Sequence, residues 1–176
     1  MARYVAFLRG INLGSTNKIS MPELREMASE LGYSNVATYI NSGNLIFGST
    51  KKVATLEREI AEAITKRFGT KTDVAVRTPA QLRKVLADNP FPDGAPTYVT
   101  VAFLTKAAPA DAKRKVAEVA TEKEPYVFAG QEVYVHYTQG QGRSKLSAKF
   151  SDILGVSATV RNLRTVTKVL ELAQDS

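Results

Sequence analysis

The sequence predicts an α+β protein built from two ferredoxin-like (split β-α-β) halves packed together, followed by a C-terminal helix. Three observations support this fold class. The order strand, helix, strand, strand, helix, strand occurs twice along the chain. The strands expected at 3–9 and 98–104 are apolar on both faces, as is typical of strands covered from both sides. With 176 residues, 44% of them hydrophobic, the chain is long enough for two small halves with a normal core.

The N-terminal half is expected at residues 1–78. After the strand at 3–9, Ser20 and Glu23 have the spacing of a capping box and predict a helix that begins near Met21 and ends at Gly32. The half continues with strands at 36–41 and 45–47, a helix at 51–68 and a strand at 72–77.

A helix and linker are expected at 79–96, because Pro79 suits a first helical turn and 89–96 contains three prolines and a glycine. The C-terminal half, expected at 97–161, has strands at 98–104, 126–128, 132–137 and 158–160 and helices at 109–120 and 146–154. A final helix at 163–172 lies in the segment 162–176. We expect the two halves to cover each other's sheets, which disfavours an RNA-recognition motif, since that motif needs an open aromatic sheet face.

Composition excludes several kinds of site. The absence of cysteine excludes disulfides, thiolate metal sites and cysteine nucleophiles. His136 is the only histidine, so a multi-histidine metal site is excluded, and its strand position predicts a solvent-facing side chain. No secretory leader or membrane-length apolar run is visible, so we expect a cytoplasmic, non-membrane protein without cofactor or metal.

Polar residues gather in four clusters that contain no carboxylate. Their candidate ligand-binding residues are Arg9, Asn12, Asn17 and Lys18 in the first cluster (9–18); Asn41, Ser42 and Asn44 in the second (41–44); Arg143, Ser144 and Lys145 in the third (140–145); and Arg161, Asn162, Arg164 and Lys168 in the fourth (161–168). Together with a net charge of +7, these residues make anionic partners plausible. A plainer interpretation competes, since glycine and asparagine also build ordinary turns and Asn162 is a natural helix N-cap.

The position of the clusters in the predicted fold is partly inferable. We expect the first and second clusters at opposite ends of the N-terminal sheet. The third cluster joins a strand to a helix, where backbone N–H groups and two cations can hold an oxyanion. Its spacing does not match a P-loop, so no nucleoside triphosphate chemistry is predicted.

The ordered motifs of the four clusters together resemble domain-of-unknown-function family 1697. They are Phe7 to Gly14 with Asn17-Lys18 and Met21, Tyr39 to Asn44 with Phe47, Gly140 to Leu146, and Thr159 to Asn162 with Thr165-Val166 and Lys168. The resemblance implies a soluble bacterial protein with paired ferredoxin-like subdomains and an unassigned role. The chain departs from the family pattern at Leu163, where a tryptophan is usual, and at Ser15-Thr16, where glycine and a basic residue are usual.

Three functional hypotheses follow. The favoured one is a binding protein for an anionic ligand, either a phosphorylated small molecule or nucleic acid. The alternative is a metal-independent enzyme acting on a phosphorylated or carboxylated substrate, which would rely on electrostatic stabilisation by arginine, lysine, asparagine and backbone N–H groups. In the third, the clusters are purely structural.

Overall fold

A computed structural model describes residues 1–174, and the chain divides into two compact units. Unit 1 combines Met1–Val85 with the C-terminal stretch from Thr167, and unit 2 is Leu86–Val166. The chain passes from unit 1 to unit 2 within helix α3 (Pro79–Ala87) and returns within helix α7 (Leu163–Gln174). Each unit contains one four-stranded antiparallel sheet.

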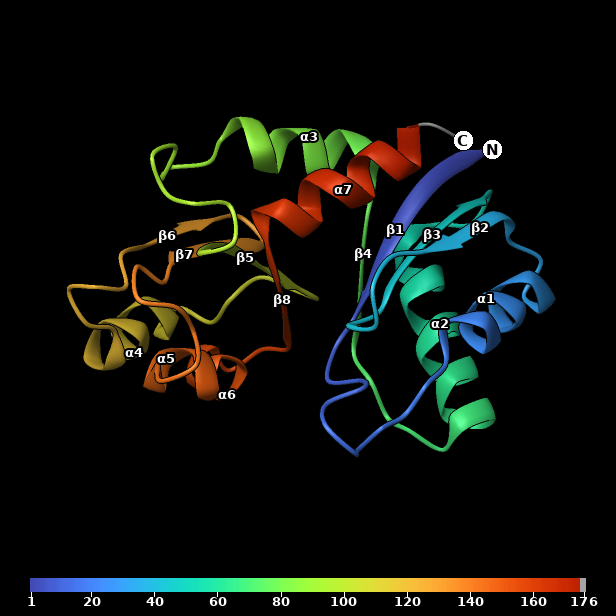
Figure 1. The fold of residues 1–176 in the computed structure, drawn as a ribbon, viewed down its shortest axis with the longest axis horizontal. Coiled ribbons are helices and arrows are strands. Elements are labelled where there is room, and N and C mark those ends of the chain that lie inside the picture. The colour runs from blue at the N-terminus through green and yellow to red at the C-terminus, as the bar shows by residue number, and fades with distance from the viewer. Residues whose placement is uncertain (175–176) are drawn as a thin grey trace. The chain divides into compact units, whose positions relative to one another are not determined.

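The sheet of unit 1 has the strand order β2-β3-β1-β4, with two helices on one face (Figure 1). Its elements are β1 (Ala2–Leu8), α1 (Met21–Glu30), β2 (Ser34–Thr38), β3 (Asn44–Ser49), α2 (Val53–Phe68) and β4 (Val74–Arg77). The capping box at the start of α1 is confirmed, because the Ser20 hydroxyl accepts a hydrogen bond from the Glu23 backbone N–H at 3.2 Å.

The core of unit 1 lies between that sheet and its helices. Alternate residues of β1 pack against buried residues of α1 and α2, including Leu24 and Ile60. Val5 and Phe7, which lie on the opposite face of β1, are also fully buried. This strand is therefore buried on both faces, as its sequence predicts.

Unit 2 repeats the topology with the strand order β6-β7-β5-β8. Its elements after α3 are β5 (Val99–Leu104), α4 (Ala112–Val119), β6 (Tyr126–Ala129), β7 (Glu132–His136), α5 (Lys145–Ala148), α6 (Phe150–Leu154) and β8 (Ala158–Asn162), after which α7 begins (Figure 1). Because both sheets show the order expected of a split β-α-β unit, the predicted fold class is confirmed.

Two local predictions in unit 2 are wrong. The single helix expected at 146–154 is broken at Lys149, whose φ of −128° and ψ of 28° are not helical, so two short helices replace it. His136 does not face solvent freely: its ring lies 5.7 Å from that of Phe91, and a Cβ on Gly94 would come within 2.9 Å of the imidazole. The proline-rich stretch 89–96 therefore packs over the end of β7.

Candidate functional site

The first and second clusters lie together in unit 1. Phe7 of β1 pairs with Asn44 of β3, so the end of β1 lies beside the start of β3. Beyond that pair, Leu8 N–H donates to Gly43 O at 2.9 Å and the Asn12 side-chain amide donates to Asn41 O at 2.8 Å. The expectation that these clusters lie at opposite ends of the sheet is wrong, because β3 runs antiparallel to β1 and the turn that precedes it meets the loop that follows β1.

Asparagine side chains build the first cluster. Asn12 donates to Ile19 O at 2.9 Å and accepts from Ile19 N–H at 2.8 Å, while Asn17 donates to Gly10 O at 3.0 Å. Both asparagines have positive φ, 53° and 50°, which this residue type tolerates better than most. Their amides therefore shape the loop through hydrogen bonds to its own backbone.

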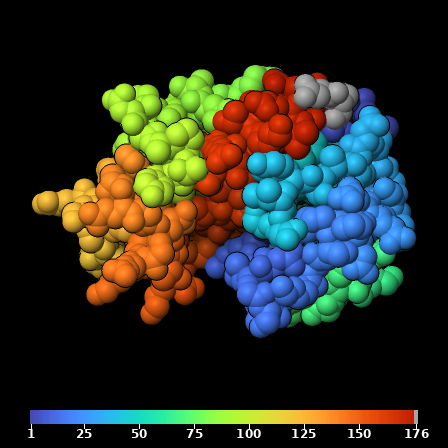
Figure 2. Space-filling model, viewed as in Figure 1, coloured from blue at the N-terminus to red at the C-terminus, as the bar shows by residue number. Residues whose placement is uncertain are grey.

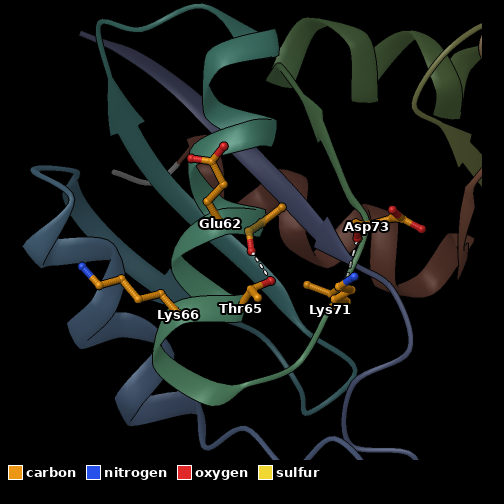
Figure 3. A pocket seen from close by; sticks show the side chains of 7 residues that line it. Glu62, Thr65, Lys66, Lys71 and Asp73 are labelled. Carbon is orange, nitrogen blue, oxygen red and sulfur yellow. Dashed lines mark hydrogen bonds between the residues drawn. The ribbon is translucent and has the colours of Figure 1, made fainter.

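The cations of the first cluster differ from each other. Arg9 forms an exposed ion pair with Asp73 at 3.4 Å, which offsets its charge, whereas Lys18 is exposed and makes no hydrogen bond or ion pair within residues 1–174. Asp73 also lines a wide, shallow pocket of about 680 Å³ (Figure 3). Lys66 and Lys71 line it together with Glu62 and Asp73, so this pocket contains charges of both signs.

The second cluster is a structural turn. Asn44 is fully buried, and its side-chain amide donates to Tyr39 O at 2.8 Å and to the Ser42 hydroxyl at 3.3 Å. The neighbouring Ile40 has a φ of 50°, an uncommon conformation for a β-branched residue, which these hydrogen bonds help to hold. The backbone O of Asn41 is used by Asn12.

The third cluster lines a groove in unit 2 that has a volume of about 1090 Å³. This part of the chain is at the molecular surface and is coloured orange in Figure 2. Two segments form the groove, 118–124 at the end of α4 and beyond, and 137–145 between β7 and α5. Two hydrogen bonds from Thr138 to Lys123 O, at 3.2 Å and 2.8 Å, join them at one point.

Glu124 is a site residue that sequence analysis missed. It is buried, its Oε1 accepts from Thr121 N–H at 3.1 Å, and its Oε2 accepts a short hydrogen bond from the Ser144 hydroxyl. Ser144 in turn caps α5 by accepting from Ser147 N–H at 3.0 Å. The Thr121-x-x-Glu124 spacing signals a local backbone contact, but nothing local signals the pairing with Ser144. The third cluster contains no carboxylate in its own sequence, but the fold places the Glu124 carboxylate against its Ser144.

The remaining polar groups of this groove are open to a ligand. Arg143 and Lys145 are exposed, and neither side chain is hydrogen-bonded or ion-paired within residues 1–174. The backbone N–H groups of Gly142 and Arg143 also donate no hydrogen bond within that part of the chain. A Cβ on Gly142 would meet nothing within 4 Å, so the backbone can be approached closely there. Successive free N–H groups beside two cations can hold an oxyanion.

A buried phenol completes the groove. Burial raises the pKa of Tyr137 above its usual value, although a hydrogen bond with Ser147 opposes this shift. The Tyr137 hydroxyl therefore stays protonated at neutral pH. It carries no charge that would repel an anion.

The fourth cluster combines structural and exposed residues. Asn162 caps α7 as predicted, since its Oδ1 accepts from Thr165 N–H at 2.9 Å. Arg161 donates to Val160 O at 2.9 Å, and burial lowers its pKa to about 10, which leaves it charged at neutral pH. Arg164 is exposed, and Lys168 forms an exposed ion pair with Glu171 at 3.6 Å.

The described residues provide neither a metal centre nor a membrane span. Within residues 1–174, no three histidine, aspartate or glutamate side chains are placed to hold a metal ion. None of the helices in the same range combines the length and apolar character that a bilayer crossing requires.

Comparison with known proteins identifies the fold and the family. A conserved bacterial protein, SP0830 from Streptococcus pneumoniae, has a similar structure with a TM-score of 0.76 and 22% sequence identity, and the similarity covers 98% of each chain. A search of curated proteins gives no significant match. The family described as "Protein of unknown function (DUF1697)" matches residues 1–134. The chain therefore belongs to the DUF1697 family, as its sequence motifs suggest.

Proposed function

We propose that this protein binds an anionic ligand, a phosphorylated small molecule or nucleic acid, in the groove of unit 2. One observation carries the proposal. The side chains of Arg143 and Lys145 and the backbone N–H groups of Gly142 and Arg143 line one open groove and are not used by the fold. Fourteen candidate ligand-binding residues were predicted from the sequence. The proposed site includes three of them, Arg143, Ser144 and Lys145.

The charges of the groove support an anion once internal pairing is considered. Three carboxylates line it, but Glu118 is paired with Arg114 at 2.6 Å and Glu124 accepts hydrogen bonds from Thr121 and Ser144. Glu122 and Glu124, whose hydrogen-bond donors are uncharged, are left to oppose the three cations Arg143, Lys145 and Lys123. The balance of unpaired charge in the groove is thus positive.

The role of Ser144 in the proposal is to fix the loop. Its hydroxyl bridges the Glu124 carboxylate and the start of α5, so the residues on either side of it, Arg143 and Lys145, have a defined backbone position. A loop that is already ordered loses less conformational entropy when a ligand binds.

The test is calorimetric titration with pyrophosphate, a mononucleotide and a short RNA. Arg143→Ala and Lys145→Ala should each weaken binding by about 1–3 kcal/mol, the range for charge-assisted contacts. Lys106→Ala is the matched control, because Lys106 is an exposed cation of unit 2 that follows β5, at the sheet end opposite to the groove loop. It removes the same charge and should leave affinity unchanged.

The same titrations separate the two ligand classes. Affinity for nucleic acid should fall steeply with salt, because several phosphate contacts release counterions, whereas one phosphate group gives a shallow dependence. If neither groove variant changes the affinity for any of the three probes, or if Lys106→Ala weakens binding equally, the assignment to this groove is wrong.

A further inference from the structure

Opposite charges line the groove of unit 2 without neutralising each other. Glu122 is exposed and makes no hydrogen bond or ion pair within residues 1–174. Arg143 and Lys145 are likewise unpaired in that range. Within that part of the chain no ion pair joins Glu122 to either cation, so all three charged groups remain accessible to a ligand.

Glu122 and the pair Arg143 and Lys145 come from different segments of the groove. Glu122 belongs to the segment 118–124, which also contributes the exposed Lys123, whereas Arg143 and Lys145 belong to the segment 137–145. The segments are fastened together by Thr138 with Lys123 and by Ser144 with Glu124, and these contacts do not involve the three charged groups. The half-buried Val119 adds an apolar surface to the lining.

We infer that the groove takes a dipolar ligand, an aminoalkyl phosphate, with its phosphate at Arg143 and Lys145 and its ammonium group at Glu122. The inference rests on the proposed function, because the phosphate end occupies the same anion site. The short alkyl chain between the two ends passes over Val119. Binding one such molecule places a complementary charge beside each unpaired group and costs less desolvation than binding two separate ions.

The experiment compares two probes that differ only in the amine, an aminoalkyl phosphate and the alkyl phosphate of equal chain length, at constant ionic strength. The wild-type protein should bind the aminoalkyl phosphate about three to five times more tightly, the factor expected for one partly exposed ion pair. Glu122→Gln should remove this preference and leave the affinity for the alkyl phosphate within about twofold. Arg143→Ala should weaken binding of both probes.

The matched control is Glu62→Gln, which removes an exposed carboxylate of unit 1 and changes the net charge equally. It should preserve the preference, which excludes a general effect of net charge. Equal affinities for the two probes, or a preference that survives in Glu122→Gln, would overturn the dipolar inference while the anion site stands. Failure of both probes to bind would also overturn the dipolar inference, and the proposed function is overturned only if pyrophosphate, the mononucleotide and the RNA fail to bind as well. Thermal unfolding of each variant checks that its fold is intact.

Discussion

Several amide and hydroxyl side chains that look like ligand-binding groups in the sequence are used by the fold itself. Asn12, Asn17 and Asn44 each bond to backbone carbonyls of their own loops, and Asn162 caps a helix. Buried polar groups must be hydrogen-bonded, so long polar loops need such residues for stability alone. The same residue types occur in a loop that binds a ligand and in a loop whose polar side chains hydrogen-bond only to its own backbone, so the sequence does not distinguish the two.

One buried residue is an exception to the rule that buried polar groups are hydrogen-bonded, and it gives a prediction for a single side chain. The Thr159 hydroxyl on β8 is the one buried side-chain polar atom within residues 1–174 that has no hydrogen-bond partner. Thr159→Val keeps the shape and removes the unpaired hydroxyl. We expect it to raise the free energy of unfolding by about 1 kcal/mol, as measured by urea denaturation.

Thr100 on the neighbouring strand β5 is the matched control. It is equally buried, but its hydroxyl donates to Val135 O at 3.0 Å. Thr100→Val leaves that carbonyl with one bond fewer and should lower stability by about 1 kcal/mol. Destabilisation by both substitutions would mean that Thr159 has a partner, such as an ordered water.

At the scale of elements, most strands and helices were predictable because their signals are local. Leu56, Ile60 and Ile64 form the helical stripe that predicts α2, and the double apolar pattern of β1 and β5 predicts strands buried on both faces. The break at Lys149 was not predictable, because an apolar spacing consistent with one helix continues across it. Contacts between distant loops, such as Glu124 with Ser144, have no local signal at all.

The side chain of Arg3 donates hydrogen bonds both to the edge strand β2 and to the end of α7. The register of β2 with β3 shifts between Ser34 and Ala37, and Arg3 donates to Ser34 O at 3.5 Å and Asn35 O at 3.0 Å. Its Nε also donates to Ala173 O near the end of α7, at 3.5 Å. Arg3 thus occupies carbonyls that would otherwise be exposed on a sheet edge and at a helix terminus.

Arg3→Met, which keeps the aliphatic stem, should lower the free energy of unfolding by about 1–2 kcal/mol, because the carbonyls lose a charged donor. Hydrogen exchange should become faster at the amides of β2 and of the last turn of α7. Arg58→Met, at an exposed arginine of the same unit, is the control. Exchange that is unchanged in Arg3→Met would show that these bonds do not hold the two elements.

At the scale of the whole molecule, both units contain tyrosines that resist ionisation. Burial is the first cause in each case: it raises the pKa of Tyr33 and Tyr137 and raises that of Tyr134 to about 12. Glu59, which accepts a hydrogen bond from Tyr33 at 2.8 Å, adds to the shift at that residue.

The sign of the resulting pH dependence follows from proton linkage. In the unfolded chain these phenols ionise near pH 10, whereas in the native state they keep their protons to higher pH. Their contribution to stability is therefore complete below about pH 10 and is lost as pH rises toward 12. Absorbance titration near 295 nm should show three of the seven tyrosines ionising late, together with unfolding. Ionisation of all seven near pH 10 in folded protein would contradict this prediction.

The return of α7 to unit 1 also sets an order of events during synthesis. Unit 2 is continuous along the chain, but unit 1 needs the residues from Thr167 onward, among which Val169, Leu170 and Ala173 are buried. A ribosome delivers the chain from its N-terminus, so the first unit to begin emerging is the last to be completed. Until α7 leaves the exit tunnel, the nascent N-terminal unit lacks the buried residues that α7 contributes. During that interval its incompletely packed apolar surface is most prone to aggregation.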